Sequence, residues 1–104
     1  MHPPILLLIS TDPHIRPLLE QALDHRQTTI LTAATTEESL RILKDRADLA
    51  LVLCDESQGR IASQVILAQA RPTDHSLPVI ILGTDGSAKA AVEALHHGAT
   101  NYLA

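Results

Sequence analysis

The sequence predicts a single α/β domain built on a parallel five-stranded sheet with helices on both faces. Two observations support this prediction. Five short apolar or β-branched runs recur at nearly even intervals along 104 residues, and a helical pattern lies between neighbouring runs. Strands that alternate with helices in this way form parallel sheets whose connecting helices cover the sheet faces. With 45% hydrophobic and 19% charged residues, the chain suits one packed domain over residues 1–104.

Three of the predicted strands are continuous apolar runs, which is typical of strands buried on both faces. They cover residues 5–9, 49–54 and 79–82. Two weaker runs, 29–33 and 100–103, contain β-branched or aromatic residues, and we expect them at the edges of the sheet.

The first helix is predicted from a start signal and an apolar repeat. Asp12 offers an N-cap and Pro13 a proline at the first helical position. Pro17 removes one early backbone hydrogen bond and allows a kink in the first turn. The residues at helical spacing that follow are Leu18, Leu19, Ala22 and Leu23.

Capping signals also frame the other three helices. Thr35 and Glu38 have the spacing of a capping box, and Gly98 is expected to close the last helix at its C′ position. The third helix is expected to end before Arg71 and Pro72. The apolar stripes expected for the three helices are Leu40, Leu43 and Ala47, then Ile61, Val65 and Ala68, then Ala88, Ala91, Val92 and Leu95.

Composition excludes several classes of function. A net charge of −4, with eight scattered basic residues, gives no electrostatic footprint for nucleic acid, and Tyr102 as the one aromatic residue leaves no base-stacking platform. The chain has no apolar run near the roughly 20 residues that cross a bilayer and no signal-peptide pattern, so we expect a cytoplasmic protein. Cys54 alone makes no internal disulfide or zinc site, and we expect it to be buried and unreactive.

Polar residues follow three of the predicted strands. Ligands of open α/β sheets bind beyond the carboxyl ends of the central strands, where these residues gather. The residues are Ser10, Thr11 and Asp12, then Asp55, Glu56 and Ser57, then Gly83, Thr84 and Asp85. Loops that cap helices produce the same pattern without any ligand, so this constellation leaves both interpretations open. No pair of nucleophile and base can be located, and we expect no enzymatic turnover.

Taken in order, these segments resemble the receiver domain of two-component response regulators along the whole chain and without an internal gap. The resemblance is carried by residues 5–19, 51–55, 77–82 and 94–103. It implies a flavodoxin-like strand order, 2-1-3-4-5. The handedness of the strand connections also leads us to expect a fifth helix that covers the end of the sheet after the last strand. Because the sequence stops at Ala104, we expect a domain that is C-terminally incomplete.

The resemblance places the phosphate-accepting aspartate of the family on Asp55. The acidic pair that holds magnesium in the family falls on Ser10 and Thr11, which carry no charge, whereas a hard divalent cation prefers carboxylate oxygens. Asp12 and Glu56 are the acidic residues nearest these positions, and any metal would have to use Asp12 and Asp55.

Two further family positions also differ. The hydroxyl residue that closes the fourth strand corresponds to Gly83, with Thr84 one residue later, and the lysine after the fifth strand would follow Ala104. Tyr102 occupies the place of the aromatic residue that turns inward when the family's aspartate is phosphorylated. The resemblance therefore indicates a degenerate receiver, or pseudo-receiver.

Three functions follow from these expectations. The one we favour is a phosphorylation-independent protein-interaction or regulatory module of a larger two-component-type protein. Its partner would be a histidine kinase or output domain, in the same polypeptide or in another one, and a homodimer is the alternative. The family commonly docks through the fourth helix and fifth strand, where the candidate residues are Lys89, Glu93, His96, His97 and Tyr102.

The second function is a true phospho-acceptor, in which Asp12, Asp55 and Glu56 hold magnesium. Magnesium is the only cofactor considered, and only if Asp55 is phosphorylated. The third is a small phosphate- or nucleotide-binding module, in which Ser10 and Thr11 receive an anion at a helix N-terminus. His96 and His97 are not expected to share a metal, because adjacent helical side chains point about 100° apart.

Overall fold

A parallel sheet of five strands forms the centre of the structure, a computed structural model that describes residues 3–23, 27–73 and 76–104. The strand order is β2-β1-β3-β4-β5, as predicted, and every neighbouring pair is parallel. The two weaker runs form the edges, which confirms that expectation. The strands are β1 (Ile5–Ile9), β2 (Thr29–Ala33), β3 (Leu49–Asp55), β4 (Val79–Leu82) and β5 (Asn101–Leu103).

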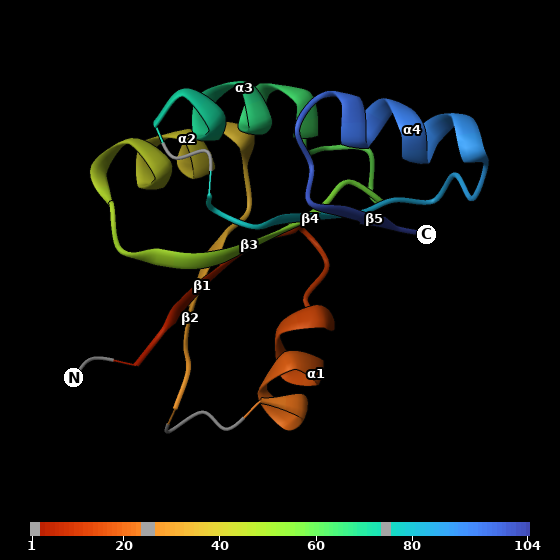
Figure 1. The fold of residues 1–104 in the computed structure, drawn as a ribbon. Coiled ribbons are helices and arrows are strands. Elements are labelled where there is room, and N and C mark those ends of the chain that lie inside the picture. Colours follow the sequence, from red (N-terminus) through yellow and green to blue (C-terminus); the bar gives the residue numbers. More distant parts are fainter. Residues whose placement is uncertain (1–2, 24–26, 74–75) are drawn as a thin grey trace.

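Helices cover both faces of this sheet. Helices α2, α3 and α4 lie side by side over one face, and α1 lies on the opposite face (Figure 1). Their bounds are α1 (Ile15–Ala22), α2 (Thr36–Asp45), α3 (Ser63–Thr73) and α4 (Ala88–His96). None of the described helices is long and apolar enough to cross a bilayer.

The main core lies between the sheet and the layer of α2, α3 and α4. Alternate strand residues are fully buried there against α3, and they are Leu7, Ile9, Val52, Cys54, Val79 and Ile81. Burial on both faces is confirmed for β1, where Leu6 and Leu8 are also buried. It is wrong for β3 and β4, whose residues on the α1 face are only half-buried, because among the described elements α1 alone covers that face.

Two of the predicted caps are present. The Thr35 hydroxyl accepts a hydrogen bond from the Glu38 N–H at 3.0 Å and opens α2. At the end of α4, Gly98 has φ +104°, its N–H donates to the Leu95 carbonyl, and the Ala99 N–H donates to the Ala94 carbonyl. This pair of bonds is a Schellman motif, which sends the chain from α4 directly into β5.

The predicted start of α1 is wrong. The helix begins at Ile15 with His14 at its N-cap position, and His14 makes no side-chain cap bond. The Asp12 carboxylate instead accepts a hydrogen bond from the backbone N–H of His14, two residues along the chain, at 2.9 Å. A short acidic side chain closes such a local turn more readily than it reaches the helix.

The predicted end of α3 is also wrong, since the helix continues through Arg71 and Pro72 to Thr73. The guanidinium of Arg71 donates to the carbonyls of Gly98 and Leu77, at 2.7 and 2.6 Å. These bonds hold Arg71 in helical geometry although a proline follows it.

The apolar stripes predicted for α3 and α4 lie on the wrong faces. In α3 the buried residues are Ile66, Leu67 and Ala70, whereas Val65 is 46% exposed. Ile61, which set the predicted phase, lies in the loop before the helix. In α4 Ala94 packs against the core and Ala90 and Ala91 are half-buried, while Val92 and Leu95 are 64% and 49% exposed. In α1 Leu18 is 62% exposed and Leu19 half-buried.

Replacing Gly98 by alanine should lower the free energy of unfolding by about 1–3 kcal/mol, because L side chains rarely adopt its backbone conformation. The new Cβ would also lie 3.1 Å from Cγ of Arg71. Urea unfolding followed by circular dichroism measures the loss. Gly86→Ala is the matched control, because its added Cβ meets nothing within 4 Å. Equal stability of the two variants would contradict this account of the α4–β5 turn.

Candidate functional site

Asp55 is the last residue of β3 and lies at the carboxyl edge of the sheet, between the ends of β1 and β4. The strand pairs Cys54 with Ile9 of β1 and Asp55 with Leu82 of β4. The side chain of Asp55 is only 1% exposed. A buried carboxylate needs hydrogen-bond donors around it, and the structure supplies them from both sides.

Both carboxylate oxygens of Asp55 accept hydrogen bonds from uncharged groups. The Ser10 hydroxyl donates to Oδ2 at 2.6 Å. The Ser57 backbone N–H and hydroxyl donate to Oδ1, at 3.0 and 2.5 Å. The Ser10 oxygen in turn accepts from the Asp12 N–H at 2.9 Å. The predicted acceptor is thus tied to the end of β1 and to the loop before α3.

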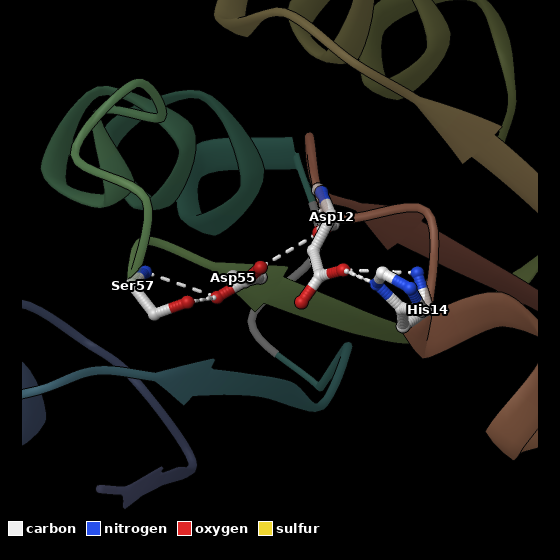
Figure 2. Close-up of polar contacts among 5 residues, drawn as sticks. Asp12, His14, Asp55 and Ser57 are labelled. Carbon is white, nitrogen blue, oxygen red and sulfur yellow. Dashed lines mark hydrogen bonds and ion pairs between the residues drawn. The ribbon is translucent and has the colours of Figure 1, made fainter.

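Asp12 is bound to His14 (Figure 2). Its Oδ1 accepts from the His14 backbone N–H and lies 3.0 Å from His14 Nδ1. These two hydrogen bonds, with the backbone one the stronger influence, hold the pKa of the Asp12 carboxyl below its usual value. The second carboxylate that a metal would need therefore already has its own partner.

Glu56 and Thr11 do not complete a metal site. The Glu56 carboxylate accepts a hydrogen bond from the Ser63 hydroxyl at the start of α3. Thr11 lines a separate pocket beside β2. Within the part of the chain that the structure describes, no group of three His, Cys, Asp or Glu side chains could hold a metal ion. The residues present do not fit a magnesium ion, which takes its protein ligands mainly from carboxylates.

The pocket beside Ser10 and Thr11, about 260 Å³, does not suit an anion. Its walls include the carboxylates of Asp12 and Glu38, and its described lining contains no Lys or Arg. The N–H group of His14, at the start of α1, is already bonded to Asp12. The geometry therefore gives no support to a phosphate or nucleotide at this end of the sheet.

Gly83 and Tyr102 lie against each other beside the predicted site. Gly83 follows β4, and its N–H donates to the Leu103 carbonyl at 2.8 Å. The Tyr102 hydroxyl donates to the Asp85 carbonyl at 2.7 Å. Thr84 is exposed and lines, with Tyr102, a pocket of about 250 Å³ between α3 and α4.

The predicted docking residues of α4 divide between two sides of that helix. Glu93 and His97 line the pocket with Tyr102, and His97 Nδ1 lies 2.7 Å from the Glu93 carbonyl. Lys89 and His96 are exposed and lie outside that lining.

Val92 and Leu95 are surface residues, contrary to expectation, because their spacing in the sequence is also that of a buried stripe. The alanines at positions 90, 91 and 94 were the available signal that the less exposed side of this helix carries small residues.

Comparisons with known proteins agree on one family. The model of the response regulator receiver domain matches residues 6–104. The transcriptional regulatory protein GlrR of Escherichia coli (strain K12) is 32% identical over 101 residues, covering 97% of this chain and 22% of GlrR. CpxR of Klebsiella pneumoniae subsp. pneumoniae (strain HS11286), another transcriptional regulatory protein, is 34% identical over 98 residues, covering 94% of this chain and 41% of CpxR.

Solved structures show the same fold. A response regulator receiver domain protein from Clostridium thermocellum superposes with a TM-score of 0.79 at 26% identity, covering 96% of this chain and 80% of that one. This chain spans less than half the length of the two curated relatives.

Replacing Asp55 by alanine should lower the free energy of unfolding by about 2–4 kcal/mol, because hydrogen bonds to a charged group contribute about 1.5–3 kcal/mol each and are not additive. Asp55→Asn, which keeps one acceptor oxygen, should lose less. Urea denaturation measures both. Asp45→Ala, at the exposed end of α2, is the control and should change stability by no more than about 0.5 kcal/mol. An Asp55→Ala protein as stable as the wild type would show that these bonds are not structural.

Cys54 should make the protein less stable at alkaline pH. Burial, and after it the nearby carboxylates of Glu56 and Asp55, raises the pKa of the Cys54 thiol from 9.0 to about 12. The unfolded thiol therefore ionises first, so its contribution is complete below pH 9 and is lost as the pH rises toward 12. The loss approaches about 1.4 kcal/mol per pH unit. Unfolding free energies of wild type and Cys54→Val over this range measure it, and parallel curves would refute it.

Proposed function

The chain belongs to the response regulator receiver domain family of signal-transduction modules, and on that premise we propose that it regulates a partner protein without phosphorylation of Asp55. The observation that carries the proposal is that both carboxylate oxygens of Asp55 already accept hydrogen bonds from Ser10 and Ser57. A phosphoryl group would have to displace the Ser10 or Ser57 hydroxyl from a carboxylate that is 1% exposed.

The charge of the site supports the same proposal. Ser10 and Thr11 stand where the family resemblance puts an acidic pair, so two negative charges that would attract a divalent cation are missing. A pair of unit charges at about 4 Å contributes about 4 kcal/mol at an effective dielectric near 20. Loss of both carboxylates therefore weakens cation binding strongly. We accordingly propose that the module works with no cofactor and no catalytic turnover of its own.

The partner that we propose is a protein, either a histidine kinase or an output domain. The relatives named above are transcriptional regulators longer than this chain, which supports a place for the module within a larger polypeptide. We place docking on the outward side of α4, where Lys89 and His96 flank the exposed apolar side chains Val92 and Leu95. A second copy of the chain is the other partner to test at this surface. We place the protein in the cytoplasm, away from membranes and nucleic acid.

Incubation with magnesium and a small-molecule phosphodonor should leave the intact mass of the protein unchanged. Mass spectrometry compares the wild type with Asp55→Ala, and a receiver domain that accepts phosphoryl groups from the same donor serves as the positive control. Circular dichroism shows that each protein is folded under the reaction conditions. We expect this because the carboxylate of Asp55 is already hydrogen-bonded by Ser10 and Ser57, and the residues around it do not fit a magnesium ion.

A phosphoryl adduct on the wild type that Asp55→Ala lacks would refute the proposal and make Asp55 a signalling switch. An adduct on both proteins would place the modification elsewhere and leave Asp55 unmodified. The docking surface is tested separately, with Val92→Asp against Leu18→Asp on the far face as a matched apolar control. Only Val92→Asp should weaken binding to a histidine kinase or output domain whose gene neighbours that of this chain. If the partner is a second copy, only Val92→Asp should weaken self-association in sedimentation velocity.

A further inference from the structure

Tyr102 occupies space that belongs to a side chain at residue 83. A Cβ placed on Gly83 would lie 2.2 Å from the Tyr102 hydroxyl oxygen, 2.6 Å from Cζ and 2.8 Å from Cε2. Real Cβ atoms essentially never approach another heavy atom within 3.0 Å. The ring therefore lies directly against the glycine backbone, and no other residue fits at position 83 unless the ring or the backbone moves.

The backbone at Gly83 is held in place on both sides. The Gly83 N–H donates to the Leu103 carbonyl of β5 at 2.8 Å. Just before it, the Leu82 carbonyl accepts from the Glu56 N–H at 2.9 Å. Moving the backbone away would break these bonds across the sheet. A side chain on residue 83 would therefore displace the ring, which turns about single bonds of its own side chain.

The ring itself is held by contacts on the α4 side. Its hydroxyl donates to the Asp85 carbonyl at 2.7 Å, and the residue packs against the main core. It forms one wall of the pocket that Leu67 and Ala94 also line. The hydrogen bond of the Tyr102 hydroxyl runs to Asp85 and does not involve Asp55 or the side chains bonded to it.

We propose that the absence of a side chain at Gly83 leaves room for the Tyr102 ring to lie inward, against the backbone of residue 83. The inward position is then the resting state of this chain, whatever the state of Asp55. Residue 83 then acts as a size gate for the ring, by which we mean that only a residue without a side chain leaves room for the inward position. The ring in turn fixes the shape of the surface between α4 and β5. This inference deepens the proposed function, because a surface held in one shape needs no phosphoryl switch. It rests on the contacts of Gly83 and Tyr102 and not on those of Asp55, so it can fail independently.

The composition of the chain makes the test direct. Tyr102 is the only tyrosine, and the sequence has no tryptophan and no phenylalanine, so intrinsic fluorescence reports this one ring. Acrylamide quenching measures its exposure. The wild type should be quenched less than free tyrosine amide, Gly83→Ala should shift toward the free value, and the matched control Gly86→Ala should match the wild type. Magnesium and phosphodonor should leave wild-type quenching unchanged.

Equal quenching of Gly83→Ala and Gly86→Ala, with both folded by circular dichroism, would overturn the inference, as would a wild type quenched like free tyrosine amide. A donor-induced change in wild-type quenching would overturn the independence from Asp55. An adduct found by mass spectrometry with unchanged quenching would instead refute the proposed function and leave the size gate standing.

A second measurement covers the case in which Gly83→Ala does not fold fully. The urea midpoint is compared for Gly83→Ala in the wild type and in a Tyr102→Leu background. Collision with the ring predicts a large downward shift in the first background and little or none in the second, since the obstructing atoms are gone. Equal shifts in both backgrounds would contradict the size gate.

Discussion

The buried carboxylate of Asp55 is the interaction on which the carboxyl edge of this domain depends. A group only 1% exposed at the end of the central strand has to be satisfied by its neighbours. Ser10 brings the end of β1 to one oxygen, and Ser57 brings the loop before α3 to the other. Three segments thereby converge on one side chain through neutral donors. The proposal that Asp55 is not phosphorylated rests on this same set of bonds.

The second constraint involves Gly83, at the end of the neighbouring strand β4, and Tyr102 of β5. Without a side chain at Gly83, the ring of Tyr102 closes over the backbone and its hydroxyl reaches the Asp85 carbonyl. Ser10 and Gly83 are thus small residues in the two places where the family resemblance puts chemical groups of the phosphorylation site. Each substitution lets a neighbour take up the freed space or hydrogen bond. Together these contacts support the proposal that this receiver scaffold works without phosphorylation of Asp55.

The sequence was sufficient to predict where the strands lie and what kind of sheet they form, because continuous apolar runs such as residues 5–9 have few alternatives. The order of the strands came from the family resemblance. The helix faces were harder to predict. Ile61 set the phase for α3 although it lies in a loop, and the alanines of α4 could not be ranked against Val92 and Leu95 without knowing how closely the helix approaches the sheet.

The sequence could predict which residues lie at the site, but not which of them contact one another. Asp55, Ser10 and Gly83 were all identified from the sequence, but the bond between Ser10 and Asp55 joins residues 45 positions apart and depends on the register of β1 and β3. Likewise, only the pairing of β4 with β5 brings Tyr102 over Gly83. Nor could local sequence show that Asp12 binds His14 in place of capping α1.

Magnesium titration by isothermal calorimetry tests the central claim most directly, because it asks whether neutral side chains have replaced a cation site. The wild-type chain is compared with a Ser10→Asp/Thr11→Asp variant that restores the acidic pair beside Asp55. We expect no saturable heat from the wild type at millimolar magnesium and a saturable isotherm from the variant. Wild-type binding as tight as that of the variant would show that Asp55 still belongs to a working metal site, and the account would be wrong.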